Sequence, residues 1–152
     1  MHDPAEHPLR AQPVARGLVL DTNVVLDLFV FLDPRAQAVA AASLSPAWRW
    51  IASRPMRDEL ERVLTYVHIL THMNSSGIRA DHVLAQYDAR THSALCAPRC
   101  SAICKDPDDQ IFIDMAVQHG TVLVSKDKAV LALKRKLAGL GVHALSAHEF
   151  TI

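Results

Sequence analysis

Four acidic residues from distant parts of the chain are the side chains best placed to do chemistry. Asp21 and Asp127 each follow a short apolar run that is typical of a buried strand. Glu59 and Asp109 fall in the first turns of two predicted helices. The carboxyl ends of parallel strands and the amino ends of the helices that follow them meet at one edge of an open α/β sheet. We therefore expect these four carboxylates to converge on one crevice.

Carboxylates that share a crevice need a counter-charge. Two of them about 4 Å apart repel by about 1 to 4 kcal/mol, depending on the local dielectric. An all-oxygen set of ligands suits Mg²⁺ or Mn²⁺, which also keep bound waters. One or two such ions can lower the pKa of a water and neutralise charge on a scissile phosphate. The sequence thus predicts a hydrolytic Mg²⁺ or Mn²⁺ site whose ligands are Asp21, Glu59, Asp109 and Asp127.

The remaining acids are interpreted differently. Asp27, Asp33 and Asp114 are expected to face solvent, and either Asp106 or Asp108 is expected to cap the helix that follows. Thr22 and Asn23 can cap the helix after Asp21 through their side-chain oxygens, and the alternative is that Asp21 is itself only a helix cap.

Other kinds of site have weaker support. His68 and His72 are four residues apart but have no flanking acidic signature, so packing or solvent exposure is favoured over metal binding. Three cysteines repeat every fourth residue, but Pro98 interrupts any helix that could align them, so structural zinc is not favoured. A glycine-rich phosphate loop is missing from the sequence. Trp48 and Trp50 are expected in the core or on a sheet face rather than against nucleic-acid bases.

The elements that would position the acids alternate between strands and helices. This alternation predicts an α/β fold with a parallel sheet and right-handed crossovers. Strands are predicted at 18–20, 48–52, 103–104, 121–124 and 141–145, and helices after 21, at 35–44, from 53 through 67, at 79–92, from about 109 to 119, and at 129–137. The helices between 53 and 92 either flank the site or form a dimer surface.

Composition limits the partners. The 152 residues include 16 basic and 16 acidic side chains, so a nucleic acid would be held by a local basic patch or by metal ions. One cluster, Lys126, Lys128, Lys134, Arg135 and Lys136, fits either an RNA track or a solvated helix face. No apolar run reaches the roughly 20 residues of a membrane span, and residues 1–15 are predicted to be a flexible tail without a signal peptide. We expect a cytoplasmic protein with one domain, 16–152.

The motifs together resemble a known family. Leu18 to Asn23, Glu59-Leu60, Asp106 to Asp109, and Val122 to Asp127 are similar, in order and spacing, to the motifs of the PIN-domain ribonucleases. The resemblance is closest to the branch that contains the toxins of toxin–antitoxin systems. It implies a three-layer α/β/α sandwich and Mg²⁺- or Mn²⁺-dependent cleavage of single-stranded RNA.

The resemblance also implies roles for individual residues. Asp21, Glu59, Asp109 and Asp127 would be the metal-binding acids, and Asn23 and Ser125 would support the acids or the metal-bound waters. Asp108, next to Asp109, could replace it as a ligand, although a role as helix cap is favoured. The implied partners are single-stranded RNA, a cognate antitoxin and a second copy in a homodimer. Two other functions stay open: a phosphoacceptor receiver-like domain, and a non-catalytic RNA-binding or assembly module.

Overall fold

A five-stranded parallel sheet forms the centre of the protein. The structure, a computed structural model, describes residues 14–151, so most of the segment predicted as a tail lies outside the described residues. The strands lie in the order β3-β2-β1-β4-β5, and every pairing is parallel. The strands are β1 (Arg16–Leu20), β2 (Trp48–Ala52), β3 (His92–Ser93), β4 (Val122–Val124) and β5 (His143–Leu145).

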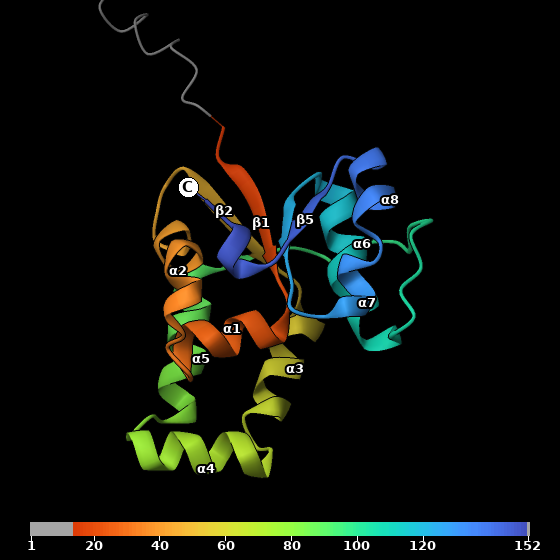
Figure 1. Ribbon diagram of the computed structural model, residues 1–152. Helices are drawn as coiled ribbons and strands as arrows, with labels where there is room; N and C mark the ends of the chain where they lie inside the picture. Colours follow the sequence, from red (N-terminus) through yellow and green to blue (C-terminus); the bar gives the residue numbers. More distant parts are fainter. Residues whose placement is uncertain (1–13, 152) are drawn as a thin grey trace, which may run out of the picture.

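Helices cover both faces of this sheet (Figure 1). They are α1 (Thr22–Phe29), α2 (Gln37–Ser43), α3 (Arg54–Val63), α4 (Val67–Ser76), α5 (Ala80–Arg90), α6 (Gln110–His119), α7 (Lys128–Leu131) and α8 (Lys134–Gly139). Short 3-10 turns lie at Pro34–Ala36, Pro107–Asp109 and Ala147–Glu149. Helices α1, α2 and α5 lie on one side and α6, α7 and α8 on the other, which confirms the predicted three-layer arrangement. Among the described residues, no helix combines the length and apolarity that a membrane crossing requires.

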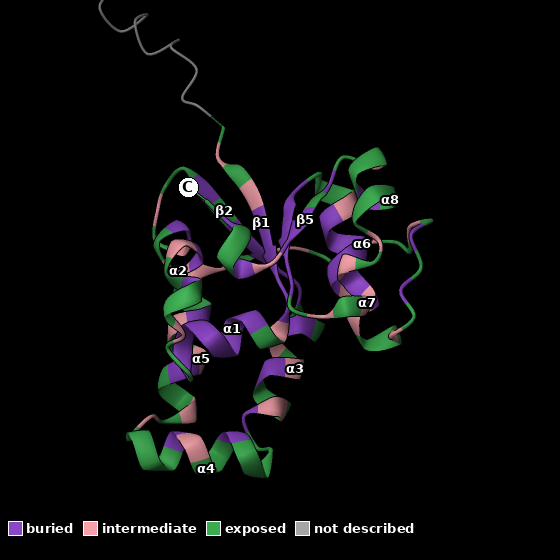
Figure 2. Ribbon diagram, in the orientation of Figure 1, coloured by how far each residue is buried: buried purple, intermediate pink, exposed green. Residues whose placement is uncertain are grey.

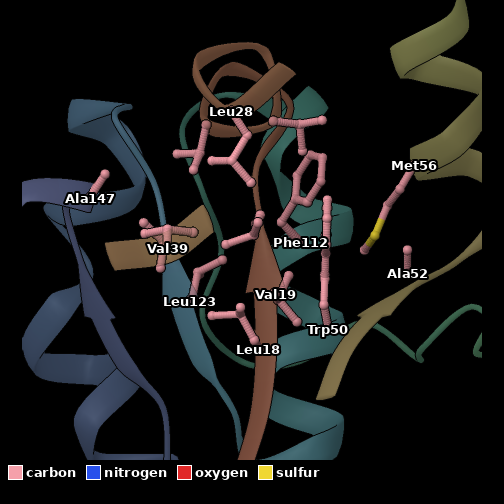
Figure 3. Close-up of a cluster of buried hydrophobic side chains, with 14 of the residues drawn as sticks. Leu18, Val19, Leu28, Val39, Trp50, Ala52, Met56, Phe112, Leu123 and Ala147 are labelled. Carbon is pink, nitrogen blue, oxygen red and sulfur yellow. The ribbon is translucent and has the colours of Figure 1, made fainter. Parts of the chain in front are cut away.

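The core is formed where the two helical layers meet the central strands. Strand β1 is buried from Leu18 to Leu20, and every residue of β4 is buried, as expected for strands covered on both faces (Figure 2). Trp50 lies among these apolar side chains (Figure 3), stacked on Phe29 and edge-on to Tyr87. The prediction that the tryptophans belong to the core is confirmed, since Trp48 is buried too.

Several local predictions were wrong, each for a visible reason. The helix from 53 does not continue to 67, because α3 ends at Val63 and the Thr65 hydroxyl donates to the Arg62 carbonyl, which competes with the helical pattern. Residues 103–104 form no strand, since the Cys104 N–H donates to a side chain instead of a neighbouring strand. The basic helix predicted at 129–137 is two helices, α7 and α8, separated by a tight turn at 132–133.

Candidate metal centre

Asp21 lies at the carboxyl end of the central strand and is almost fully buried. Its backbone N–H donates to the Val124 carbonyl (3.1 Å), which extends the pairing of β1 with β4 by one residue. Its Oδ1 accepts from the Val24 N–H (2.9 Å), so Asp21 itself caps α1. The prediction that Thr22 and Asn23 are the caps was wrong, because helical geometry already begins at Thr22.

Ser125 connects the two acids that end neighbouring strands. Its hydroxyl, fully buried, donates to Asp21 Oδ2 and accepts from the Asp127 N–H (3.0 Å). The Lys126 N–H also donates to Asp21 Oδ2 (3.2 Å). Asp127 in turn caps α7 by accepting from the Ala129 N–H (2.8 Å). The loop after β4 is thus joined to Asp21 by one buried and one partly buried hydrogen bond, which fixes where Asp127 projects.

Three carboxylates gather beside this loop. Oxygens of Asp106, Asp109 and Asp127 all lie within 4.8 Å of one another, which is close enough to hold one metal ion. Asp109 Oδ2 is buried and has no hydrogen-bond partner among the described residues. Asp106 was predicted only as a possible helix cap, and it does cap the 3-10 turn by accepting from the Asp108 N–H (3.0 Å). Its place in the cluster could not be predicted, because an acid that only caps a helix and an acid that also binds a metal have the same sequence pattern.

The electrostatics of the cluster favour a cation. Burial raises the pKa of Asp109 to about 8, helped by the neighbouring carboxylate of Asp127 and by the negative charges of Asp106 and Asp21. Burial also raises the pKa of Asp21, against the opposing effect of its hydrogen bonds from Ser125, Val24 and Lys126. A hard divalent ion would supply both the missing charge and the missing partner of Asp109 Oδ2. The residues present therefore fit the predicted metal.

Glu59 and Asn23, the other predicted site residues, lie outside the cluster of three acids. Glu59 Oε2 accepts from the hydroxyl of Thr22 (2.7 Å), the residue that follows Asp21, so α3 places Glu59 beside α1. Glu59 is not one of the three clustered acids. Asn23 is exposed on the first turn of α1. Among the predicted acids, Asp109 and Asp127 are brought together directly, Asp21 is joined to them through Ser125 and Glu59 is joined through Thr22.

A buried polar network holds the loop that carries Asp106. The side chain of Gln110 accepts from the Cys104 N–H (2.8 Å) and donates to the Ala102 carbonyl (2.9 Å) and to Asp114 Oδ1 (2.8 Å). Asp114 also accepts from the Cys100 N–H (3.0 Å). The expectation that Asp114 faces solvent was wrong. The backbone N–H groups of the long segment after β3 need acceptors, and Asp114 on α6 supplies one to Cys100.

Asp27 was also wrongly expected to face solvent. It is buried on α1, and its carboxylate pairs with Lys126 Nζ at 3.1 Å. This ion pair adds a second tie between α1 and the loop after β4. Asp33 is held by Arg35, which donates to both of its carboxylate oxygens.

The position of the site follows from the topology. The chain winds from β1 toward β2 and β3 on one side and toward β4 and β5 on the other, so the winding reverses between β1 and β4. In open α/β sheets, ligands bind outside the carboxyl ends of the strands at this reversal. Asp21 and Asp127 follow these two strands.

Comparison with known families agrees with this geometry. The family model described as the PIN domain matches residues 17–129, from the start of β1 into α7. The chain belongs to the PIN-domain family. The resemblance seen in its motifs is thereby confirmed, and a family of nucleases is favoured over a receiver-like domain. A search of curated proteins found no significant match to the sequence of this PIN domain.

Solved PIN-domain structures share the fold at low sequence identity. VapBC2 from Rickettsia felis, bound to a DNA fragment from their promoter, has a TM-score of 0.54 at 13% identity and covers 84% of this chain and 98% of that one. The PIN domain endonuclease Utp24 has a TM-score of 0.50 at 20% identity, covering 87% of this chain and 86% of that one. Both likenesses concern the arrangement of strands and helices.

Proposed function

We propose that this PIN domain is a Mg²⁺- or Mn²⁺-dependent endoribonuclease that hydrolyses phosphodiester bonds of single-stranded RNA. The observation that carries the proposal is the cluster of Asp106, Asp109 and Asp127 beside Asp21, with one buried carboxylate oxygen unpartnered. Carboxylates placed this close, at the carboxyl edge where the winding reverses, are suited to a divalent ion and an anionic substrate.

The acidic side chains and Ser125 have different roles in this proposed site. Asp109, Asp127 and Asp106 would hold the metal, and Asp21 would complete the negative site from the end of β1. A bound divalent ion supplies an acidified water and neutralises charge on the phosphate. Ser125 positions Asp21 and Asp127 relative to each other through its two hydrogen bonds. Glu59 accepts a hydrogen bond from Thr22 beside Asp21 and would orient waters there.

We further propose that the protein acts in the cytoplasm and that a cognate antitoxin restrains it. Support for a partner protein comes from the structural likeness to VapBC2, a toxin–antitoxin protein whose structure was solved on promoter DNA. A homodimer, formed through the helices between β2 and β3, is part of the same proposal. Size-exclusion chromatography with light scattering tests the dimer directly.

The test of the catalytic proposal is cleavage of labelled single-stranded RNA with Mn²⁺, with Mg²⁺ and with a chelator. We expect cleavage with either metal, none with the chelator, and a loss of at least about 100-fold in Asp127→Asn, because the metal site loses a charged ligand. Asp108→Asn is the matched control, since Asp108 is exposed and outside the cluster. Unchanged turnover in Asp127→Asn would rule out the site. RNA binding without any cleavage would instead identify the non-catalytic module.

A further inference from the structure

The amino-terminal edge of the sheet, opposite the acids, carries a row of basic side chains. Each strand begins at or near one of them, and because the sheet is parallel these beginnings share one edge (Figure 1). In the order of the strands across the sheet, the row is His92, Arg49, Arg16, His119 and His143. All five residues are exposed. We call these five residues the amino-edge row.

Three hollows of about 670, 460 and 290 Å³ lie along this edge, all touching Ala15. Among residues 14–151, no Asp or Glu lines any of the three. Within residues 14–151, Arg49 and His143 make no salt bridge. The Arg16 guanidinium is held in place 4.6 Å above the Trp48 ring. The metal-site acids therefore lie at one edge of the sheet, and two arginines and three histidines lie at the other.

The dimensions match a single nucleic-acid strand. Five strands spaced about 4.8 Å apart make a row about 19 Å long. That length corresponds to about five or six stacked nucleotides at about 3.4 Å each. Along β1, five residues at about 3.3 Å each separate the row from the acids by about 16 Å in a straight line. Because β1 is covered on both faces, an RNA must pass around the helical layers, so the connection takes more than about five further nucleotides.

We propose that the amino-edge row binds the phosphate backbone of single-stranded RNA and so anchors long substrates that are cleaved at the opposite edge. The inference rests on the proposed ribonuclease function and adds a second binding surface to it. Arginine guanidinium groups and imidazole N–H groups donate to phosphate oxygens without reading base sequence.

Binding is tested without catalysis. Fluorescence anisotropy of a labelled 20-nucleotide oligouridine RNA is measured in chelator at 50 to 200 mM salt. The row variant is Arg49→Glu/His143→Glu, and the matched control is Arg62→Glu/His68→Glu, which makes the same charge change at exposed positions near α4. We expect the row variant to bind at least about 10-fold more weakly at the lowest salt. The salt slope should fall by about 1.4, since two phosphate contacts are lost and each accounts for about 0.7. The control should stay within about twofold of wild type.

Cleavage with Mn²⁺ then separates the row from the catalytic site. A 4-nucleotide RNA cannot reach from the acids to the row, so its cleavage should be unchanged in the row variant, whereas the KM for the 20-nucleotide RNA should rise about 10-fold. Equal RNA affinity in the two variants overturns the proposal, and so does equal loss on both RNA lengths. A labelled 20-residue polyglutamate that depends on the row while RNA does not would assign the row to an acidic protein. If Mn²⁺ supports no cleavage but the row variant still loses RNA affinity, the catalytic function fails and the row stands.

Discussion

Replacing Asp109 by asparagine should stabilise the metal-free protein at high pH. The change removes one charge from carboxylates that lie within 4.8 Å of one another, at nearly constant volume. Two unit charges at this separation interact by about 1 kcal/mol in water and by about 3.5 kcal/mol at an effective dielectric of about 20. Because Asp109 is only partly buried, water screens part of the repulsion. We expect Asp109→Asn to raise the free energy of unfolding by about 1 to 3 kcal/mol above pH 8.

The pH dependence of this difference has a definite sign. The pKa of Asp109 rises from 3.8 to about 8 on folding, so between these values the folded protein holds a proton that the unfolded chain has released. Wild-type stability therefore falls as pH rises from about 4 to about 8. The asparagine variant lacks this term, so its advantage should be small at pH 4.5, grow with pH, and level off above 8.

Urea unfolding followed by fluorescence of the buried Trp48 and Trp50 measures both proteins in chelator at pH 4.5 and 8.5. Saturating Mn²⁺ should make wild type the more stable of the two proteins, because a ligand at about 1,000 times its Kd adds about 4.1 kcal/mol to the protein that binds it. Asp108→Asn serves as the control and should follow wild type in both conditions. The reasoning is refuted if Asp109→Asn is less stable than wild type in chelator at pH 8.5, or if Mn²⁺ stabilises both proteins equally.

Three further changes test the packing around the site. Ser125→Ala leaves a buried carboxylate and a backbone N–H without their shared partner, so it should cost about 1 to 3 kcal/mol in urea unfolding and slow RNA cleavage at least about 10-fold. Gly17→Ala places a Cβ 2.5 Å from Thr121 Cγ2 and should lower the free energy of unfolding by about 1 to 3 kcal/mol. Thr121→Ser in the double variant should restore part of that loss. Full stability of the single variant would contradict this contact. Lys126→Met leaves the buried carboxylate of Asp27 unpaired and should lower the free energy of unfolding by about 1 to 2 kcal/mol, a moderate loss because the lysine is half-exposed. The double variant with Asp27→Asn should recover stability. Equal loss in the single and double variants would argue against the ion pair.

The sequence by itself determined the parallel α/β framework and the edge at which the acids would meet. Apolar runs such as 18–20 and 122–124 signal strands covered on both faces, and a residue that follows such a strand is placed at the carboxyl edge by chain direction alone. Asp21 and Asp127 could be located in this way because their positions depend on local pattern and on the right-handed crossover.

Only the tertiary structure decided which acids touch and which pair elsewhere. Asp106 joins the cluster, Asp27 is buried against Lys126, and Asp114 accepts from the Cys100 N–H. These contacts join segments whose approach depends on how the helices and the long loop after β3 pack. The spacing of residues along the chain does not predict such long-range contacts. An acid on a helix face has the same sequence pattern whether it contacts water or a buried partner.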